Sequence, residues 1–154
     1  RRLGHAFTLV LAVAGLASLY AVTRIAPAAH GAASDSDSVA FSPAKLQSLR
    51  DAGTPVFVDM TADWCITCKA NEHTVLDTDT FRDLLKRTGT VYMMGDWTNV
   101  DPVITAFLQQ YHSPGVPLYV IFPKDGGDGK VLPSVLTLSL VQQELLETVR
   151  TGAD

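Results

Sequence analysis

The sequence centres on the stretch Val56-Phe57-Val58-Asp59-Met60-Thr61-Ala62-Asp63-Trp64-Cys65-Ile66-Thr67-Cys68-Lys69. Its first half is an apolar, β-branched run, which predicts a buried strand over 55–60 followed by a short turn. A Cys-x-x-Cys pair then opens a segment that predicts a helix from Cys65 towards Leu76. The two cysteines of the pair are the only ones in the chain. The stretch therefore predicts a strand, a turn and a helix, with both sulfur atoms near the start of the helix.

The spacing of the cysteines permits a reversible disulfide. Residues three apart on a helix lie on one face with Cα atoms roughly 5 to 6 Å apart, a separation that a disulfide bridges. Cys65 would lie at or just before the first helical turn, where unpaired N–H groups and the helix dipole stabilise a thiolate. Cys68 lies one turn deeper and should be less exposed. We therefore expect Cys65 to attack a partner's disulfide and Cys68 to resolve the mixed disulfide.

Charged neighbours act on the pKa of Cys65 in both directions. The helix start and Lys69 favour the thiolate, whereas Asp59 and Asp63 oppose it through like-charge repulsion. The pKa of a free cysteine is about 8.5. We expect only a modest depression from that value.

Two other uses of the cysteine pair are less favoured. A zinc site would take Cys65, Cys68 and His73 as ligands, but structural zinc sites usually have four ligands and a second clustered pair. An inert structural disulfide closing so few residues would remove little entropy from the unfolded chain. We expect no metal, and no cofactor other than a redox-active Cys65–Cys68 disulfide.

The segment from Phe57 to Lys69 resembles the active-site strand, turn and helix of thioredoxin-like proteins. More narrowly, the pattern Ala-Asp-Trp-Cys-x-x-Cys-Lys-x-x-Glu over 62–72, with Asp96-Trp97-Thr98 and 115–120 later, resembles the C-terminal domain of the DsbD family. Those are membrane proteins that carry electrons outward to extracytoplasmic disulfides. The resemblance covers roughly 41–149, and it implies a thioredoxin fold of the α/β class, with a central mixed sheet flanked by helices.

The resemblance also implies roles for single residues. Asp59 falls where the family has a buried aspartate, whose raised pKa would let it accept and return the proton of Cys68. The alternative is a strand-end residue hydrogen-bonded to backbone. Val116-Pro117 resembles the loop that carries a cis proline facing the cysteines, and the backbone of Val116 would pair with the partner's chain as an added strand. Trp64 is either an apolar contact for the partner or a packed side chain.

The remaining motif residues carry weaker expectations. We expect Trp97 and Tyr119 to be packing residues and Glu72 to be a solvated glutamate. Ile66 and Thr67, between the cysteines, include no histidine that would stabilise the thiolate. That absence favours a reductant over an oxidant.

The N-terminal residues predict a membrane segment. The sequence from Leu3 to Val22 is almost entirely apolar, near the ~20 residues that a helix needs to cross a bilayer, and two arginines precede it. We expect a transmembrane helix or anchor over 1–25, because the lack of an initial methionine suggests that more chain came before. A secretory signal, with small residues at 26–29 for cleavage, is the alternative. Both place the rest of the chain outside the cytoplasm.

The rest divides into a linker and a domain. Residues 26–41, rich in Ala, Ser and Asp, predict a flexible linker, and 42–154 a thioredoxin-like domain. Capping and spacing signals predict helices over 43–52 and 65–76, a short one capped near Thr78, one starting at Asp101-Pro102 with Val103 among its core-facing residues, and a last one capped by Ser139. Strands are expected over 55–60, over 90–94 with Gly95 ending it, over 117–122 and over 130–132. The alternation predicts parallel strands first and an antiparallel pair at the end.

These observations predict a protein-disulfide reductase anchored in the inner membrane, with its thioredoxin-like domain on the periplasmic side. It would relay two electrons from a transmembrane donor domain with a cysteine pair to extracytoplasmic thiol–disulfide proteins. The net charge of −4 and the lack of a basic cluster argue against a nucleic-acid partner. The alternatives are a singly anchored reductant for cytochrome c maturation and a non-catalytic thioredoxin-fold module that binds a protein or carries a metal.

Overall fold

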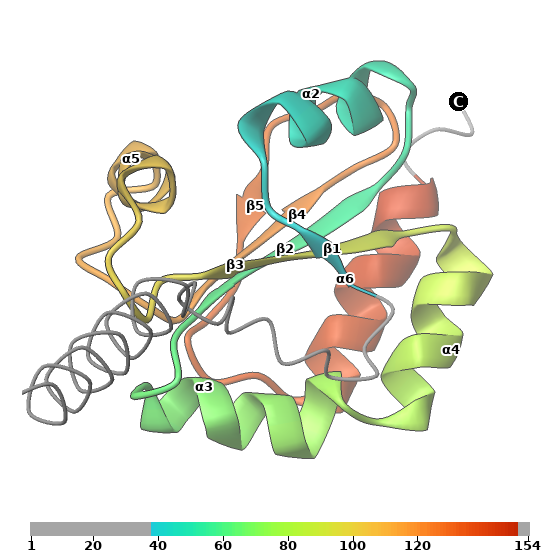
Figure 1. Cartoon of the computed structure of the whole chain (residues 1–154). Helices are drawn as coiled ribbons and strands as arrows, with labels where there is room; N and C mark the ends of the chain where they lie inside the picture. Colours follow the sequence, from blue (N-terminus) through green and yellow to red (C-terminus); the bar gives the residue numbers. More distant parts are fainter. Residues whose placement is uncertain (1–37, 151–154) are drawn as a thin grey trace, which may run out of the picture. The chain divides into compact units, whose positions relative to one another are not determined.

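The structure is a computed structural model in which residues 38–150 are described (Figure 1). These residues belong to one structural unit. The membrane helix predicted over 1–25 and most of the predicted linker lie outside the described residues. No helix within 38–150 has both the length and the apolar character that crossing a membrane requires.

A five-stranded sheet forms the centre of the domain. The elements in chain order are β1 (Val39–Ala40), α2 (Pro43–Asp51), β2 (Val56–Thr61), α3 (Ile66–Asn71), η1 (Glu72–Leu76), α4 (Asp79–Thr88), β3 (Val91–Asp96), α5 (Pro102–Gln110), β4 (Leu118–Phe122), β5 (Lys130–Val131) and α6 (Leu138–Arg150). The strand order is β1-β3-β2-β4-β5. Strands β1 and β2 run parallel to β3, whereas β4 runs antiparallel to β2 and β5 antiparallel to β4. The predicted mixture of parallel and antiparallel strands is confirmed.

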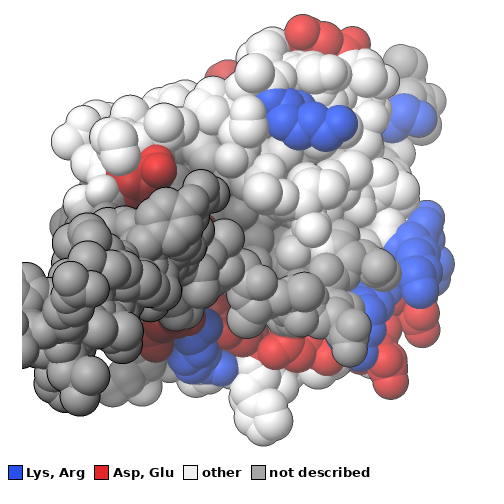
Figure 2. Space-filling view, viewed as in Figure 1, with Lys and Arg blue, Asp and Glu red and all other residues white. Residues whose placement is uncertain are grey.

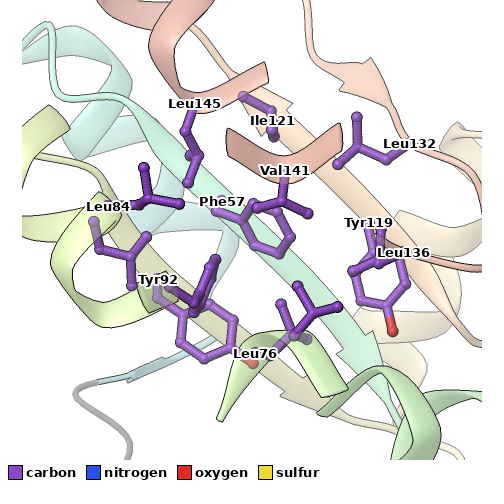
Figure 3. Packing of buried hydrophobic residues seen from close by; sticks show 13 residues of the cluster. Phe57, Leu76, Leu84, Tyr92, Tyr119, Ile121, Leu132, Leu136, Val141 and Leu145 are labelled. Atoms are coloured by element: carbon purple, nitrogen blue, oxygen red, sulfur yellow. The ribbon is translucent and has the colours of Figure 1, made fainter. Parts of the chain in front are cut away.

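Strand β2 is buried along its whole length and faces a different core on each side. Because side chains alternate along a strand, Phe57, Asp59 and Thr61 share one face and the residues between them share the other. The core around Phe57 is covered by α4, α6 and η1 (Figures 1 and 3). The core on the opposite face contains side chains of α2 and α5. The sheet thus has helices on both faces, as predicted.

The predicted linker ends earlier than expected. Strand β1 pairs with β3, the Phe41 N–H donates to the Met94 carbonyl (2.8 Å), and the Phe41 ring lies 4.9 Å from that of Phe107. The prediction that the linker extends through residue 41 was wrong for its last residues. Val39 and Phe41 follow a polar run in the sequence, and they contact β3 and α5 only in the folded domain.

Three local expectations also need correction. Gly95 lies inside β3 rather than ending it, because its pairing with β2 continues opposite Met60 and Thr61. Glycine fits this position because an added Cβ would clash with the Met60 sulfur. Val103 is 46% exposed, because the other apolar positions of α5 already fill its core face. The cap of α6 is Thr137, whose hydroxyl accepts the Leu140 N–H (3.3 Å), and Ser139 lies inside the helix.

Candidate active site

The two cysteines form a disulfide at the start of α3. The Cα atoms are 5.2 Å apart, within the range predicted from the spacing. Cys65 is the N-cap of the helix, and its sulfur accepts the backbone N–H of Cys68 (3.2 Å). Cys65 is 6% exposed and Cys68 is fully buried, which is the predicted order. A sulfur that receives a backbone N–H at a helix start is a good site for a thiolate, so the geometry favours Cys65 as the attacking residue.

The turn between β2 and α3 is held by the segment that follows β3. The Thr98 hydroxyl accepts the Asp63 N–H (2.9 Å), and the Thr98 carbonyl accepts the indole N–H of Trp64 (3.2 Å). Asp96 in turn accepts the Thr98 N–H (2.8 Å). The sequence contains this motif, but its spacing gave no sign that it supports a turn more than thirty residues earlier.

Trp64 is anchored at its edge and open on its face. Its ring lies 6.1 Å from that of Trp97, yet 56% of the residue is exposed. Trp97 donates its indole N–H to Thr105 (2.9 Å) and is half-buried, which fits the predicted packing role. Of the two roles considered for Trp64, the exposed face favours contact with a partner.

Thr98→Val should loosen this turn. The variant loses the acceptor for the Asp63 N–H, so we expect about 1 kcal/mol less stability and severalfold slower disulfide exchange as Trp64 becomes less ordered. Urea unfolding and an exchange assay with a protein disulfide measure the two effects. Thr105→Val is the matched control, since its hydroxyl serves Trp97 instead. Equal exchange rates in the two variants would contradict a role for Thr98 at the site.

A groove of about 400 Å³ lies beside the disulfide. Its lining comes from four separate parts of the chain and consists of Trp64, Trp97, Ser113, Pro114, Gly115, Val116, Pro117 and Ser134. The Val116–Pro117 peptide bond is cis, and Val116 packs against the cluster that contains both cysteines. The structure therefore brings the predicted loop and Trp64 to the cysteine pair.

The charged residues around the pair compensate one another. Lys69 lies 2.8 Å from Glu72 and 3.6 Å from Asp63. Burial alone would lower the pKa of Lys69, but its contacts with these two carboxylates raise it above the ordinary value. Glu72 also accepts the Thr61 hydroxyl (2.7 Å), and its side chain is only 18% exposed. The prediction of a solvated Glu72 was wrong, because Thr61 points from β2 towards the active-site helix.

Asp59 is a buried carboxyl with one hydrogen bond. It lies within β2, and its Oδ2 accepts the hydroxyl of Tyr92 on β3 (2.7 Å). Burial raises the pKa of Asp59 to about 7, with the hydrogen bond from Tyr92 acting in the opposite direction. The alternative of a strand-end residue bonded to backbone was wrong. Nothing in the local sequence indicated Tyr92 as the partner.

Asn71 is a second site residue that the sequence did not indicate. This buried side chain of α3 donates to the Tyr119 hydroxyl (3.0 Å) and to the Ser134 carbonyl (2.7 Å), and accepts the Leu136 N–H (3.0 Å). It therefore joins the active-site helix to one wall of the groove. Tyr119 is fully buried, which confirms its predicted packing role.

A metal site would require several His, Cys, Asp or Glu side chains close together. Within residues 38–150, no three His, Cys, Asp or Glu side chains are grouped so as to hold a metal ion. The zinc set of Cys65, Cys68 and His73 is thus not assembled. On the face drawn in Figure 2, the visible basic side chains are spread over the surface, several of them beside acidic ones.

A family model described as thioredoxin-like matches residues 37–124. The chain belongs to the thioredoxin-like family. This thioredoxin-like chain is 36% identical over 85 residues to "Thiol:disulfide interchange protein DsbD 1" of Pseudomonas aeruginosa, and 35% identical over 81 residues to the DsbD protein of Klebsiella pneumoniae. These alignments cover 55% and 52% of this chain, but only 14% and 13% of the two relatives.

Solved structures show the same fold. The oxidised C-terminal domain of Neisseria meningitidis DsbD matches with a TM-score of 0.55 and 23% identity, over 70% of this chain and 96% of that domain. A thioredoxin of Thermus thermophilus matches with a TM-score of 0.60 and 18% identity, over 76% of this chain and 91% of the other. The predicted thioredoxin fold and the similarity to DsbD C-terminal domains are confirmed. Together with the disulfide they support thiol–disulfide chemistry in general.

Proposed function

We propose that this chain is the reducing thioredoxin-like domain of an extracytoplasmic protein-disulfide reductase. The observation that carries the proposal is the Cys65–Cys68 disulfide at a helix N-cap, beside a groove that includes Trp64 and the Val116-Pro117 loop. The direction of electron flow is supported by the absence of a histidine between the two cysteines and by the resemblance to the DsbD family described in the sequence analysis. In this proposal, electrons come from a cysteine pair in a transmembrane domain and pass to other extracytoplasmic thiol–disulfide proteins.

On this chain the reaction uses Cys65, Cys68 and Asp59, while the partner supplies a disulfide and the donor supplies a dithiol. In the reduced domain, the Cys65 thiolate attacks one sulfur of the partner's disulfide, and the partner's other sulfur leaves as a thiolate. Cys68 then gives its proton to Asp59, and the resulting thiolate attacks the Cys65 sulfur. The Cys65–Cys68 bond forms, the bond from Cys65 to the partner breaks, and the partner has gained two electrons. The reverse sequence with the donor's dithiol restores the reduced domain.

The groove suits an extended segment of a partner. Its lining is mainly apolar, and Val116 lies directly against the cysteine cluster. A partner strand laid along Val116 could form backbone hydrogen bonds there while its cysteine approaches Cys65. The exposed face of Trp64 would cover part of that segment. Lys69, Asp63 and the groove residues then orient the partner without taking part in bond making.

The location in the inner membrane, with the domain on the periplasmic side, is part of the same proposal. It rests on the apolar N-terminal sequence and on the similarity to DsbD proteins. The same chemistry would serve a singly anchored reductant for cytochrome c maturation. The identity of the trapped partners distinguishes the two arrangements.

The test is partner trapping in native membranes with Cys68→Ser. This variant keeps Cys65 but lacks the thiol that would release it, so mixed disulfides should accumulate. We expect adducts with a multi-span membrane protein and with a second extracytoplasmic thiol protein, both identified by mass spectrometry. A double variant, Cys65→Ser with Cys68→Ser, is the matched control and should trap neither. If no adduct forms while Cys65 can still be alkylated, the proposal fails, and the hypothesis of a non-catalytic binding module is favoured instead.

A further inference from the structure

We propose that Tyr92 is a positioning residue for the exchange reaction: its hydroxyl occupies one oxygen of Asp59 and leaves the other, Oδ1, to take the proton of Cys68. The inference rests on the proposed function, because it concerns the second step of that reaction. It goes further by assigning a part to a residue of β3 and by naming the accepting atom.

The two oxygens of Asp59 have different surroundings. Oδ2 accepts the Tyr92 hydroxyl at 2.7 Å. Oδ1 is buried and has no hydrogen-bond partner among residues 38–150. A buried carboxylate oxygen without a partner is costly, and such a group in a folded protein calls for an explanation. An oxygen kept free to bind a proton during the reaction provides one.

Tyr92 is held firmly in place. Its ring packs against Phe57, with ring centroids 5.9 Å apart, and edge-on against Phe81 at 5.4 Å. Phe57 lies opposite Tyr92 in the parallel pair of β2 and β3, and Asp59 is the next residue of β2 on the same face. The Tyr92 ring lies among the core side chains around Phe57, which set its orientation (Figure 3). From this ring the hydroxyl reaches Asp59 diagonally.

Asp59 faces the active-site helix. Its neighbour on the same strand face, Thr61, donates a hydrogen bond to Glu72, the residue that follows α3. The charged and titratable groups that act on Asp59 come from β3, β4, the active-site helix and the turn after it; they are Tyr92, Tyr119, Lys69, Glu72 and Asp77. Among them, Tyr92 is the one that donates a hydrogen bond to the Asp59 carboxyl.

Burial and the hydrogen bond from Tyr92 act in opposite directions on the pKa of Asp59. Burial raises the pKa of Asp59 to about 7, and Tyr92 limits this rise because a donated hydrogen bond favours the ionised form. Burial and the charge of Asp59 raise the pKa of Tyr92, so its hydroxyl stays a donor. Near neutral pH, Asp59 can therefore be ionised before the proton transfer and neutral after it, which a proton acceptor requires.

The proton step balances within the site. The Cys68 thiol loses its proton to Asp59 Oδ1, and the thiolate attacks the Cys65 sulfur of the mixed disulfide. The Cys65–Cys68 bond forms as the partner leaves with the bonding electron pair. Asp59 later returns the proton, either to the leaving thiolate or to solvent, and the Tyr92 hydrogen bond persists throughout.

Tyr92→Phe tests the inference, with Tyr119→Phe as the matched control. Both substitutions remove one buried phenol oxygen next to Phe57, but the Tyr119 hydroxyl is bonded to Asn71 instead of Asp59. Carbon-13 NMR of the aspartate carboxyls in the oxidised chain, with Asp59 assigned through Asp59→Asn, follows the titration directly. We expect the midpoint of Asp59 to rise by about one to two pH units in Tyr92→Phe and to stay nearly unchanged in Tyr119→Phe.

A kinetic readout links the midpoint to the reaction. The rate at which Cys68 resolves a preformed mixed disulfide should increase with pH as Asp59 ionises. In Tyr92→Phe this increase should occur at a higher pH, displaced by the same number of pH units as the NMR midpoint. In an Asp59→Asn background, Tyr92→Phe should not displace the pH dependence further. Site-specific 3,5-difluorotyrosine at position 92, a stronger donor that keeps the hydroxyl, should move both readouts the opposite way.

The outcomes separate this inference from the proposed function. If the wild-type chain exchanges disulfides normally while the Asp59 midpoint is the same in Tyr92→Phe and wild type, the assignment of Tyr92 is overturned. If the wild-type chain does not exchange disulfides at all, the proposed function fails, whatever the NMR titration shows for Tyr92.

Discussion

Cys65→Ser is expected to abolish disulfide reduction by this chain, lowering the rate by roughly 1,000-fold or more to the buffer background. The serine hydroxyl stays protonated at neutral pH and cannot replace the thiolate at the helix N-cap. Reduction of insulin, with dithiothreitol as the electron source, measures the loss.

Cys68→Ser separates the two roles. This variant keeps the attacking sulfur, so it should release one equivalent of thiol from an aromatic disulfide in a single turnover and then stop. If Cys65→Ser gave that burst and Cys68→Ser did not, the assignment of attacking and resolving residues would be reversed.

Asp59→Asn should change the pH dependence of stability by roughly 4 kcal/mol. The pKa of Asp59 is raised in the folded chain from 3.8 to about 7. Between these values the folded chain holds a proton that the unfolded chain has lost, so wild-type stability falls as pH rises, and it levels off above the folded pKa. Asparagine cannot ionise and avoids this loss.

Urea unfolding of the oxidised proteins from pH 4 to pH 9 tests this expectation. The difference in unfolding free energy, variant minus wild type, should grow in favour of Asp59→Asn up to about pH 7 and then stay constant. A difference that is flat over the whole range would show that Asp59 does not carry a raised pKa. The same variant should resolve mixed disulfides more slowly, so the site would keep a carboxyl that lowers stability because the reaction uses it.

The local features of this domain could be predicted from the sequence because they depend on residues close together in the chain. Ser42, Thr78 and Asp101 cap their helices by accepting N–H groups two or three residues later. The separation of Cys65 and Cys68 follows from helical spacing in the same way. The parallel and antiparallel strand directions were predicted from the lengths and types of the connections, together with the family resemblance.

The surroundings of the cysteines depended on tertiary structure. Tyr92 reaches Asp59 only because β3 pairs with β2 in a particular register. Thr98 supports Trp64 only because β3 ends beside the active-site turn.

What the sequence by itself determined is the strand, turn and helix that place two cysteines one helical turn apart. The tertiary structure alone decided which buried partner each carboxyl meets and which loops form the groove. The physical reason is range: caps and cysteine spacing depend on backbone geometry over three or four residues, whereas the partners of Asp59 and Trp64 lie more than thirty residues away. Their meeting depends on the order and register of the strands.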